Sequence, residues 1–550
     1  MHDRHTPVLI VGGGLTGLST ALFLAWHGVR SLLVERHPDL LIHPRLRGVN
    51  PRSMELFRQV GLEPDIRAAT YADPERFEWH AVLAETLASD TYVPATDAVE
   101  GVETGEESPC RGGPIDQDKL EILLRARARA LGADVRFSTE LVSFTQDEEG
   151  VAAVLRDRRD GATRTLRADY LVAADGSASP IRAALGVGVD GPGPLFQALT
   201  AIVEADLRPA RRGRPLSIAY LQQPTPGTVM LSHDDLGLRW VFATGYAPER
   251  GQSLSDFTDE RVAALVRAAA GLPDVAVTLR PQIPGTDLKV LGFTIGAQVA
   301  REYRVGRVFL VGDAAHVVPP TGGFGGSTGI QDTHNLAWKL AAVLRGRAGP
   351  ALLDTYHAER HPIGLFTLGQ ALARTQARMG IRGVEPPPLV EYATVTYGYQ
   401  YRSSAILGAA DDAEPLAPRE LAGQPGTRAP HLAIIHAGQA CSTIDLYGRG
   451  WVLLAGPAGG AWVAAAERAA QRLQLPLEAD RFGVELTPAA GAARHGLGED
   501  GALLVRPDGF VAWRAPVLAG QPQRTLEGVL TRLLARAPAG QAPALAARAG

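Results

Sequence analysis

The chain has 550 residues, a formal net charge of −4 at pH 7 and two cysteines. At about 150 residues per domain, this length suggests three or four packed units. The sequence contains no basic run, no long apolar span and no metal-binding spacing around Cys110 or Cys441, so we expect a cytoplasmic protein without nucleic acid, membrane or metal among its partners.

The first predicted unit is a strand, a glycine turn, a helix and a second strand. The strand VLIV is followed by Gly12, Gly14 and Gly17 in GGGLTG, and the next strand, SLLVE, ends at Glu35. Glycines let the backbone approach a pyrophosphate, which the N-terminus of the following helix stabilises. An acid at the end of the second strand suits an adenosine ribose. The pattern therefore predicts a dinucleotide site, and a glycine turn needed only for close helix packing is the alternative.

Two later segments also follow predicted strands. In LVAADGSASPIR, Asp175 lies directly after a buried strand. In VFLVGDAAHVVPPTGGFGGSTG, Asp313 follows a strand and is placed to bond sugar hydroxyls, while the glycine loop leads into a helix. The N-terminus of that helix would stabilise negative charge on a bound ligand. We expect His316 to pack in the intervening turn instead of carrying a proton.

The order GGGLTG, DGSASPIR, GDAAH resembles the FAD-dependent aromatic hydroxylases, the family that contains p-hydroxybenzoate and phenol hydroxylases. Within that family, the length and the C-terminal unit are most similar to the polyketide hydroxylases of tetracenomycin, anthracycline and angucycline pathways. The resemblance extends over nearly the whole chain. It implies FAD as cofactor, NAD(P)H as a transient co-substrate, with NADPH favoured, and O2 as the oxidant.

The reaction that the resemblance implies is hydroxylation of an aromatic, polyketide-type polycyclic phenol by a flavin hydroperoxide. A Baeyer–Villiger oxygenase acting on a polyketide ketone and a flavin-binding scaffold without turnover remain as alternatives. A flavin halogenase is disfavoured because no two tryptophans are spaced as W-x-W. The expected partner is a small aromatic molecule, the expected state is monomer or homodimer, and no residue is assigned as catalytic.

The predicted fold class is α/β. A Rossmann-like FAD-binding domain over residues 1–180 resumes over 291–395, after an inserted, mainly β substrate-binding domain over 181–290. Residues 396–430 are expected to form a linker, because they are rich in proline and polar residues. The resemblance implies that the remaining unit, 431–550, is thioredoxin-like.

The resemblance also assigns residues to parts of FAD. The pyrophosphate, the adenosine, the ribityl chain and the flavin ring would be held by Gly12, Gly14, Leu15, Thr16, Gly17, Glu35, Arg36, Arg45, Gln117, Asp175, Asp313, Gly326, Ser327 and Thr328. Ser327 stands where many relatives have asparagine, and serine can also cap a helix.

Some of these residues have other interpretations. Arg45 and Arg47 could form surface ion pairs, and Gln117 could be an ordinary early helix residue. Candidates for the substrate wall are Tyr220, Trp240, Pro320 and Gly322. Core packing explains the two aromatic residues equally well.

Overall fold

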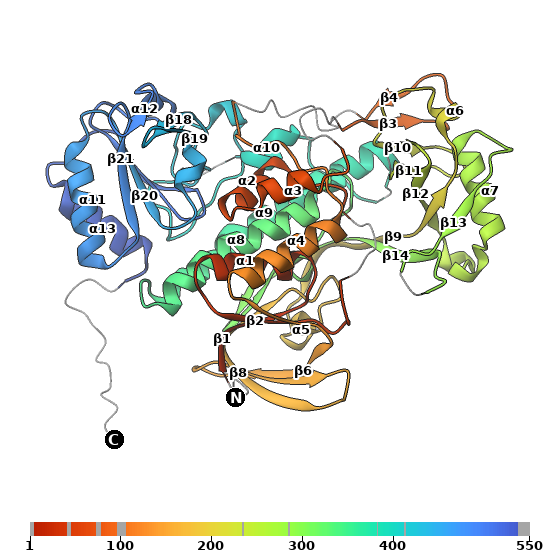
Figure 1. Cartoon of the computed structure of the whole chain (residues 1–550), viewed down its shortest axis with the longest axis horizontal. Coiled ribbons are helices and arrows are strands. Elements are labelled where there is room, and N and C mark those ends of the chain that lie inside the picture. Colours follow the sequence, from red (N-terminus) through yellow and green to blue (C-terminus); the bar gives the residue numbers. More distant parts are fainter. Residues whose placement is uncertain are drawn as a thin grey trace.

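The computed structural model describes residues 5–40, 46–72, 79–95, 106–233, 236–283, 286–381, 383–411 and 414–536. Three units lie in a row in Figure 1, with the C-terminal unit at the left, an α/β unit in the centre and a second sheet at the right. Two long helices, α8 (Phe324–Leu344) and α9 (Asp354–Met379), cross the centre. None of the helices within the described ranges combines the length and the apolar character needed to span a bilayer.

The central unit contains an eight-stranded sheet in the order β15-β16-β8-β1-β2-β5, with β7 paired to β8 and β6 to β7. Strands β16, β8, β1, β2 and β5 are parallel to one another, so their carboxyl ends share one edge of the sheet. The strands are β1 (His5–Val11), β2 (Ser31–Val34), β5 (Asp134–Arg136), β6 (Thr139–Gln146), β7 (Val151–Asp157), β8 (Thr163–Ala173), β15 (Arg304–Val305) and β16 (Val308–Leu310).

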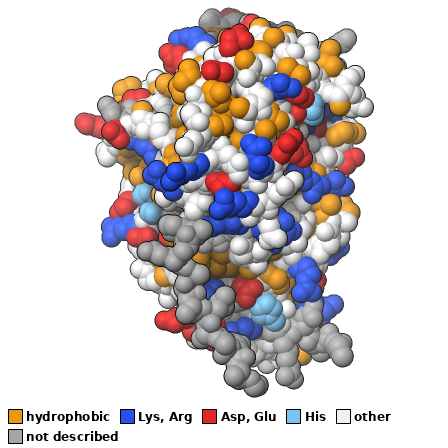
Figure 2. Space-filling model, turned by 90° about the vertical axis from the view of Figure 1, so that its left-hand side faces the viewer, with side chains coloured by type: hydrophobic (Ala, Val, Ile, Leu, Met, Phe, Trp, Pro, Cys, Tyr) orange, Lys and Arg blue, Asp and Glu red, His pale blue; other side chains and the backbone are white. Residues whose placement is uncertain are grey.

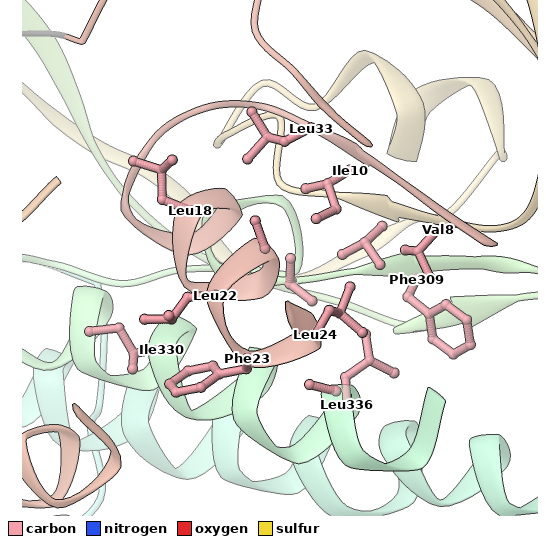
Figure 3. Packing of buried hydrophobic residues seen from close by; sticks show 14 of the residues in the cluster. Val8, Ile10, Leu18, Leu22, Phe23, Leu24, Leu33, Phe309, Ile330 and Leu336 are labelled. Atoms are coloured by element: carbon pink, nitrogen blue, oxygen red, sulfur yellow. The ribbon is translucent and has the colours of Figure 1, made fainter. Parts of the chain in front are cut away.

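Helix α1 (Leu15–Trp26) is buried on nearly every side because it lies between this sheet and α8. Figure 3 shows Leu22 and Phe23 of α1 beside Ile330 of α8, and Leu18 and Leu336 belong to the same buried cluster. This apolar layer fixes the start of α1 relative to α8. The other helices of this part are α2 (Pro51–Gln59), α3 (Glu63–Ala68), α4 (Gln117–Ala130) and α5 (Pro180–Ala184).

The second sheet has nine strands in the order β17-β14-β9-β12-β11-β10-β3-β4, with β13 beside β9. The long strands β9 and β14 connect it to the central unit (Figure 1). The strands are β3 (Ala81–Ala84), β4 (Val93–Pro94), β9 (Val189–Glu204), β10 (Ile218–Leu221), β11 (Thr228–Ser232), β12 (Arg239–Tyr246), β13 (Thr278–Arg280), β14 (Val290–Ala300) and β17 (His316–Val317). Strands β3 and β4 belong to this sheet although they lie inside residues 1–180, which the sequence assigned to the FAD-binding domain.

The C-terminal unit contains a four-stranded sheet in the order β21-β20-β23-β24 and a small sheet in the order β19-β18-β22. Its elements are β18 (Ala433–His436), β19 (Gln439–Ser442), β20 (Trp451–Ala455), α11 (Gly460–Leu473), β21 (Leu477–Arg481), β22 (Leu486–Thr487), β23 (Ala502–Val505), β24 (Val511–Ala515) and α13 (Pro522–Leu533). Figure 2 shows acidic and basic side chains intermingled over this end of the molecule. Pairs such as Arg472–Glu527, at 2.8 Å, are exposed and contribute little to stability.

The expected linker, 396–430, is packed instead of free. Helix α10 (Tyr392–Tyr397) ends at Tyr397, and Tyr399 and Tyr401 follow it. All three tyrosine side chains are almost completely buried. The Tyr401 ring stacks on Phe510 with centroids 4.0 Å apart. Composition suggested a linker because proline and polar residues are frequent there, but the regularly spaced tyrosines anchor the segment, which we call the tyrosine strap (residues 397–401).

Replacing Phe23 with alanine tests the core between α1 and α8. Phe23 is fully buried, and its ring contacts the ring of His334 with centroids 4.9 Å apart. We expect Phe23→Ala to lower the free energy of unfolding by about 3–5 kcal/mol, because the removed ring leaves a cavity. Urea denaturation measures the loss. The control is Ile122→Ala on α4, since Ile122 is 51% exposed; an equally large loss in this control would contradict the interpretation.

Candidate functional site

Four strand ends and two helix N-termini meet at one edge of the parallel sheet. Gly12 follows β1, Glu35 follows β2, Asp175 lies two residues after β8, and Asp313 lies three residues after β16. Helices α1 and α8 begin beside them. In open parallel sheets, ligands bind outside the carboxyl ends of the strands. The residues that the sequence singled out are therefore brought together at the edge where a ligand is expected.

Close packing requires glycine at one position in the turn after β1 and at another in the first turn of α1. Gly12 has φ of 110°, and a Cβ there would lie 2.1 Å from the carbonyl oxygen of Ala174. A Cβ on Gly17 would lie 1.9 Å from the carbonyl oxygen of Gly12. Close packing, the alternative for these glycines, is thus present. The start of α1 is also uncapped, because its N-cap residue, Gly14, has no side chain that could accept a hydrogen bond from the first N–H groups. Those groups can bind an anion.

Glu35 lies against the glycine turn. One carboxylate oxygen accepts the N–H of Gly13 at 2.6 Å, and the other accepts the N–H and Nδ1 of His37 at 2.8 and 2.6 Å. The side chain keeps 13% exposure, so sugar hydroxyls can still reach it. Arg36 beside it is exposed. No motif in the sequence indicated His37.

The start of α4 borders the same turn. Gln117 is the first residue of α4, and its Nε2 donates to Oε1 of Glu121 at 2.8 Å. That oxygen would lie 3.7 Å from a Cβ on Gly14. Gln117 is therefore an early helix residue that also lies at the site. Arg45 is outside the described residues.

Arg47 links the central unit to the second sheet. It forms an ion pair with Asp116 at 2.5 Å and donates to the carbonyl oxygen of Ser232, at the end of β11, at 2.9 Å. Its guanidinium also lies 4.1 Å from the centroid of the Tyr71 ring. The expected ion pair exists, but it is almost buried between two units instead of lying on the surface.

Thr16 is the point where α1, the turn Gly312–Ala314 and α8 touch. A Cβ on Gly312 would lie 2.5 Å from its hydroxyl oxygen, and a Cβ on Gly329 would lie 2.8 Å from it. Both glycines are thus required by packing. The neighbouring Asp313 side chain is exposed at the sheet edge, where it can reach a ligand.

Helix α8 offers backbone groups to a ligand. It begins at Phe324 after Gly323, which has φ of 65° and no side chain for capping. Ser327 does not cap the helix, because it lies in the first turn and its hydroxyl accepts the N–H of Asn50 at 3.2 Å; its contact with FAD stays a prediction. The Thr328 hydroxyl donates to the carbonyl oxygen of Phe324 at 2.9 Å. The N–H groups of the first turn therefore remain available to bind a ligand.

The loop before α8 is more open than the helix. In this loop Pro320 is exposed and Gly322 is half-buried, and Gly326, in the first turn of α8, is also half-buried. A Cβ on Gly326 would lie 2.5 Å from Cδ1 of Leu46. Any larger residue at position 326 would therefore displace the segment that precedes α2.

Asp175 organises its own loop. Its two oxygens accept the hydroxyl of Ser179 at 2.6 Å and the N–H of Ile181 at 3.1 Å. Burial raises the pKa of this carboxyl, although these hydrogen bonds oppose the shift. Arg182 from the same loop donates to the carbonyl oxygen of Ala314 at 2.8 Å, which ties the loop to the Gly312–Ala314 turn. The contact of Asp175 with FAD stays a prediction.

The two aromatic candidates for the substrate wall lie on opposite faces of the second sheet. Trp240 is fully buried in the cluster under α7 (Asp259–Ala270), and its Nε1 donates to the carbonyl oxygen of Gly237 at 3.1 Å. Its assignment to the substrate wall is therefore wrong. Tyr220 is on the other face, where Nη1 of Arg378 donates to its hydroxyl at 3.2 Å. Strand alternation separates the two residues.

The face that carries Tyr220 is apolar and only partly covered. The strand registers place alternate residues of β3, β10, β11 and β12 on this face. Its half-buried apolar residues are Leu83, Ile218, Val229, Leu231, Val241 and Ala243. Because Arg47 bonds both the end of β11 and Asp116, which precedes α4, this face ends close to the start of α4. It can form the wall of an aromatic pocket.

Sequence reasoning missed the polar residues behind and opposite the site. Arg378 stands near the end of α9 without any motif. Asp332 and Arg360 are fully buried on α8 and α9 and pair with each other at 2.7 Å. A charged residue within an otherwise buried helix was the available signal for Asp332, since charges are seldom buried without a partner.

Two family models together match most of the chain. Residues 5–369 match the model described as FAD binding domain, and residues 422–537 match the model described as aromatic-ring hydroxylase, C-terminal. The first match contains all the strand ends and helix starts of the site. The second covers most of the C-terminal unit.

Full-length relatives and solved structures are also similar. The chain is 43% identical to tetracenomycin A2 monooxygenase-dioxygenase of Streptomyces glaucescens, with 98% of each chain covered. It is 44% identical to 4-methyl-5-nitrocatechol 5-monooxygenase of a Burkholderia species, with 97% of this chain and 98% of the relative covered. The structure of aklavinone-11 hydroxylase with FAD and aklavinone has a TM-score of 0.88 and 41% identity, covering 98% of this chain and 100% of that one.

Replacing Asp313 with alanine tests the sheet edge as the FAD site. We expect Asp313→Ala to purify as a folded but largely colourless protein, with FAD affinity lowered roughly tenfold to a hundredfold by the lost sugar contacts. Absorbance at the flavin bands and titration of the apoprotein with FAD measure the loss. Asp160→Ala, in the turn between β7 and β8, is the control. Stoichiometric FAD in Asp313→Ala would remove Asp313 from the site.

Proposed function

Since this chain belongs to the FAD-dependent aromatic-ring hydroxylase family, we propose that it hydroxylates a polycyclic phenol of the polyketide type, using O2 and NAD(P)H, with NADPH preferred. The resemblance seen in the sequence is confirmed, and the chain is a flavin-dependent monooxygenase. The observation that supports a large, flat substrate is the half-buried apolar sheet face that carries Tyr220.

The residues at the sheet edge fit FAD. The tight glycine turn leaves room for a pyrophosphate above the uncapped N-terminus of α1, and Glu35 is placed for the adenosine ribose. Asp313 would bind sugar hydroxyls, and the first turn of α8 would approach the pyrimidine edge of the flavin ring. When bound, FAD supplies hydride acceptance and oxygen activation, which amino-acid side chains do not provide.

The protein's own tasks are to bind the phenol, to orient it and to exclude water. Leu231 and Val241 form part of an apolar wall that a flat ring system can cover. This contact removes water from the wall and from the face of the ring system. Arg378 donates to the Tyr220 hydroxyl, so the proton of that hydroxyl is free to point toward a substrate oxygen. The permanent positive charge of Arg378 favours the ionised form of a nearby phenol, which is the form most easily oxidised.

Similarity to relatives does not indicate how many rings the substrate has, so the shape of the pocket must determine it. A relative named for a single-ring nitrocatechol is as similar to this chain as one named for tetracenomycin A2. The structure of the product distinguishes hydroxylation from a Baeyer–Villiger reaction, which inserts oxygen into a carbon–carbon bond. The rate of NADPH oxidation distinguishes an enzyme from a flavin-binding scaffold without turnover. We therefore expect substrate-dependent NADPH oxidation with polycyclic phenols and naphthacenequinones, and a weaker response to catechols.

The C-terminal unit is proposed to be thioredoxin-like and to act as a brace. Parallel strands β20 and β21 are joined through α11, and the antiparallel strands β23 and β24 are followed by α13, an order that fits this fold. Among the described residues, Cys441 is the only cysteine of the unit, so a redox pair does not form there. Buried ion pairs to α9, described below, support the bracing role.

Product analysis tests the reaction. We expect the product to gain one oxygen atom and to keep every carbon–carbon ring bond, with NADPH consumed in the same molar amount. Mass spectrometry and NMR of the product measure both. Cleavage of a ring bond would instead favour the Baeyer–Villiger reaction, and the absence of stimulation over the whole panel, with FAD bound, would favour a scaffold.

Replacing Tyr220 with phenylalanine tests substrate orientation. We expect Tyr220→Phe to keep its FAD and its fold but to hydroxylate at least about tenfold more slowly, with more NADPH diverted to hydrogen peroxide, because the phenol is less well positioned. Product yield per NADPH measures the effect. Tyr246→Phe is the matched control, because Tyr246 packs against Phe257 near α7. Unchanged yield in Tyr220→Phe would exclude this residue from orientation.

A further inference from the structure

A buried carboxylate lies directly behind the proposed FAD site. Asp332 of α8 has no solvent exposure, and its two oxygens accept three hydrogen bonds. Oδ2 accepts the N–H of Gly312 at 3.1 Å and Nε2 of His316 at 2.7 Å, and Oδ1 accepts Nε of Arg360 at 2.7 Å. One side chain of α8 thus holds the turn that carries Asp313.

Arg360 extends these contacts in two directions. Its Nη2 donates to the carbonyl oxygen of Thr328, in the second turn of α8, at 3.1 Å. Its Nη1 donates to the hydroxyl of Tyr401 in the tyrosine strap at 3.0 Å. The Asp332–Arg360 pair therefore connects the Gly312–Ala314 turn, the beginning of α8 and the strap that leads to the C-terminal unit.

The charge of this carboxylate is maintained by its neighbours. Burial raises the pKa of Asp332, but the positive charge of Arg360 and the contact with His316 outweigh burial and bring the pKa below its ordinary value. The ionised carboxylate can accept from all three donors around it, because it carries no proton of its own. Removing either charge of the pair would leave the other buried without compensation.

We propose that Asp332 is a positioning residue for FAD, holding the Gly312–Ala314 turn and the start of α8 at the spacing at which Asp313 and the N–H groups of α8 contact the cofactor together. This inference rests on the FAD site proposed above. Asp332 itself is too deeply buried to touch the cofactor, so it acts through the two segments that it holds.

A neighbouring buried acid provides a matched control. Glu359 of α9 is equally buried and accepts from Lys339 at 2.7 Å and from Arg506 at 2.6 and 2.8 Å. Its other hydrogen bonds come from Asn335 at 2.7 Å and Ser403 at 2.6 Å, so within the described structure its hydrogen-bond partners lie outside the Gly312–Ala314 turn and the first turn of α8. Loss of either acid should weaken the fold, but only loss of Asp332 should change how FAD is held.

The experiment compares Asp332→Asn with Glu359→Gln. Asparagine keeps the shape of the side chain but lacks the charge and places a donor among three donors. We expect both apoproteins to melt at a lower temperature than the wild type. We expect the FAD dissociation constant to rise at least tenfold in Asp332→Asn only. In the FAD-saturated proteins, the flavin reduction potential should become more negative in Asp332→Asn and stay unchanged in Glu359→Gln, because a displaced α8 N-terminus stabilises the reduced flavin less.

A second variant covers the case in which Asp332→Asn does not fold. Arg360→Lys keeps the charge beside Asp332 but loses the fork that reaches Thr328 and Tyr401, and it should shift the potential in the same direction. Wild-type affinity and potential in both variants, or equal shifts in Glu359→Gln, would overturn the positioning role while leaving the FAD site intact. A wild-type chain that binds no FAD would overturn both proposals.

Discussion

The parallel pairing of β16, β8, β1 and β2 is the constraint on which the site depends. Parallel strands send their carboxyl ends to the same edge, so residues more than 300 positions apart in the sequence, such as Gly12 and Asp313, become neighbours. The connections between these strands then place the starts of α1 and α8 at that edge. At that edge, both helices begin without a side-chain cap, so their first backbone N–H groups are available to a ligand beside the carboxylates of Glu35 and Asp313.

The three units are held together by buried charges as well as by apolar contact. Glu359 on α9 pairs with Arg506 of the C-terminal unit, and Glu55 on α2 pairs with Arg428 beyond the tyrosine strap. Lys339 pairs with the same carboxylate as Arg506, that of Glu359. Burial lowers the pKa of Lys339 to about 8, although the negative charge of Glu359 opposes the shift. Such pairs contribute less net stability than apolar residues would, but they allow only one arrangement of the partners. The C-terminal unit is therefore docked in a specific orientation beside the cofactor-binding unit.

Local features of the site could be predicted from the sequence, and pairings between distant segments could not. The glycine turn and Glu35 were predictable because each lies within one strand–helix–strand segment. The opposite orientations of Tyr220 and Trp240 were not, because alternation shows that two faces exist but not which face α7 covers. Glu55 and Arg428 are separated by 373 residues, and nothing in either segment identifies the other. Composition likewise suggested a linker where tyrosine side chains make a packed segment.

The strand alternation of the second sheet has a consequence for how this scaffold can diversify. On β11 and β12, Met230 and Phe242 belong to the core under α7, whereas their chain neighbours Val229, Leu231, Val241 and Ala243 belong to the open face. Mutations at the open-face positions change the proposed substrate wall without making cavities in the core. A new ring system can therefore be accommodated by changes at every second residue, so that specificity and folding are under separate selection on the same strands.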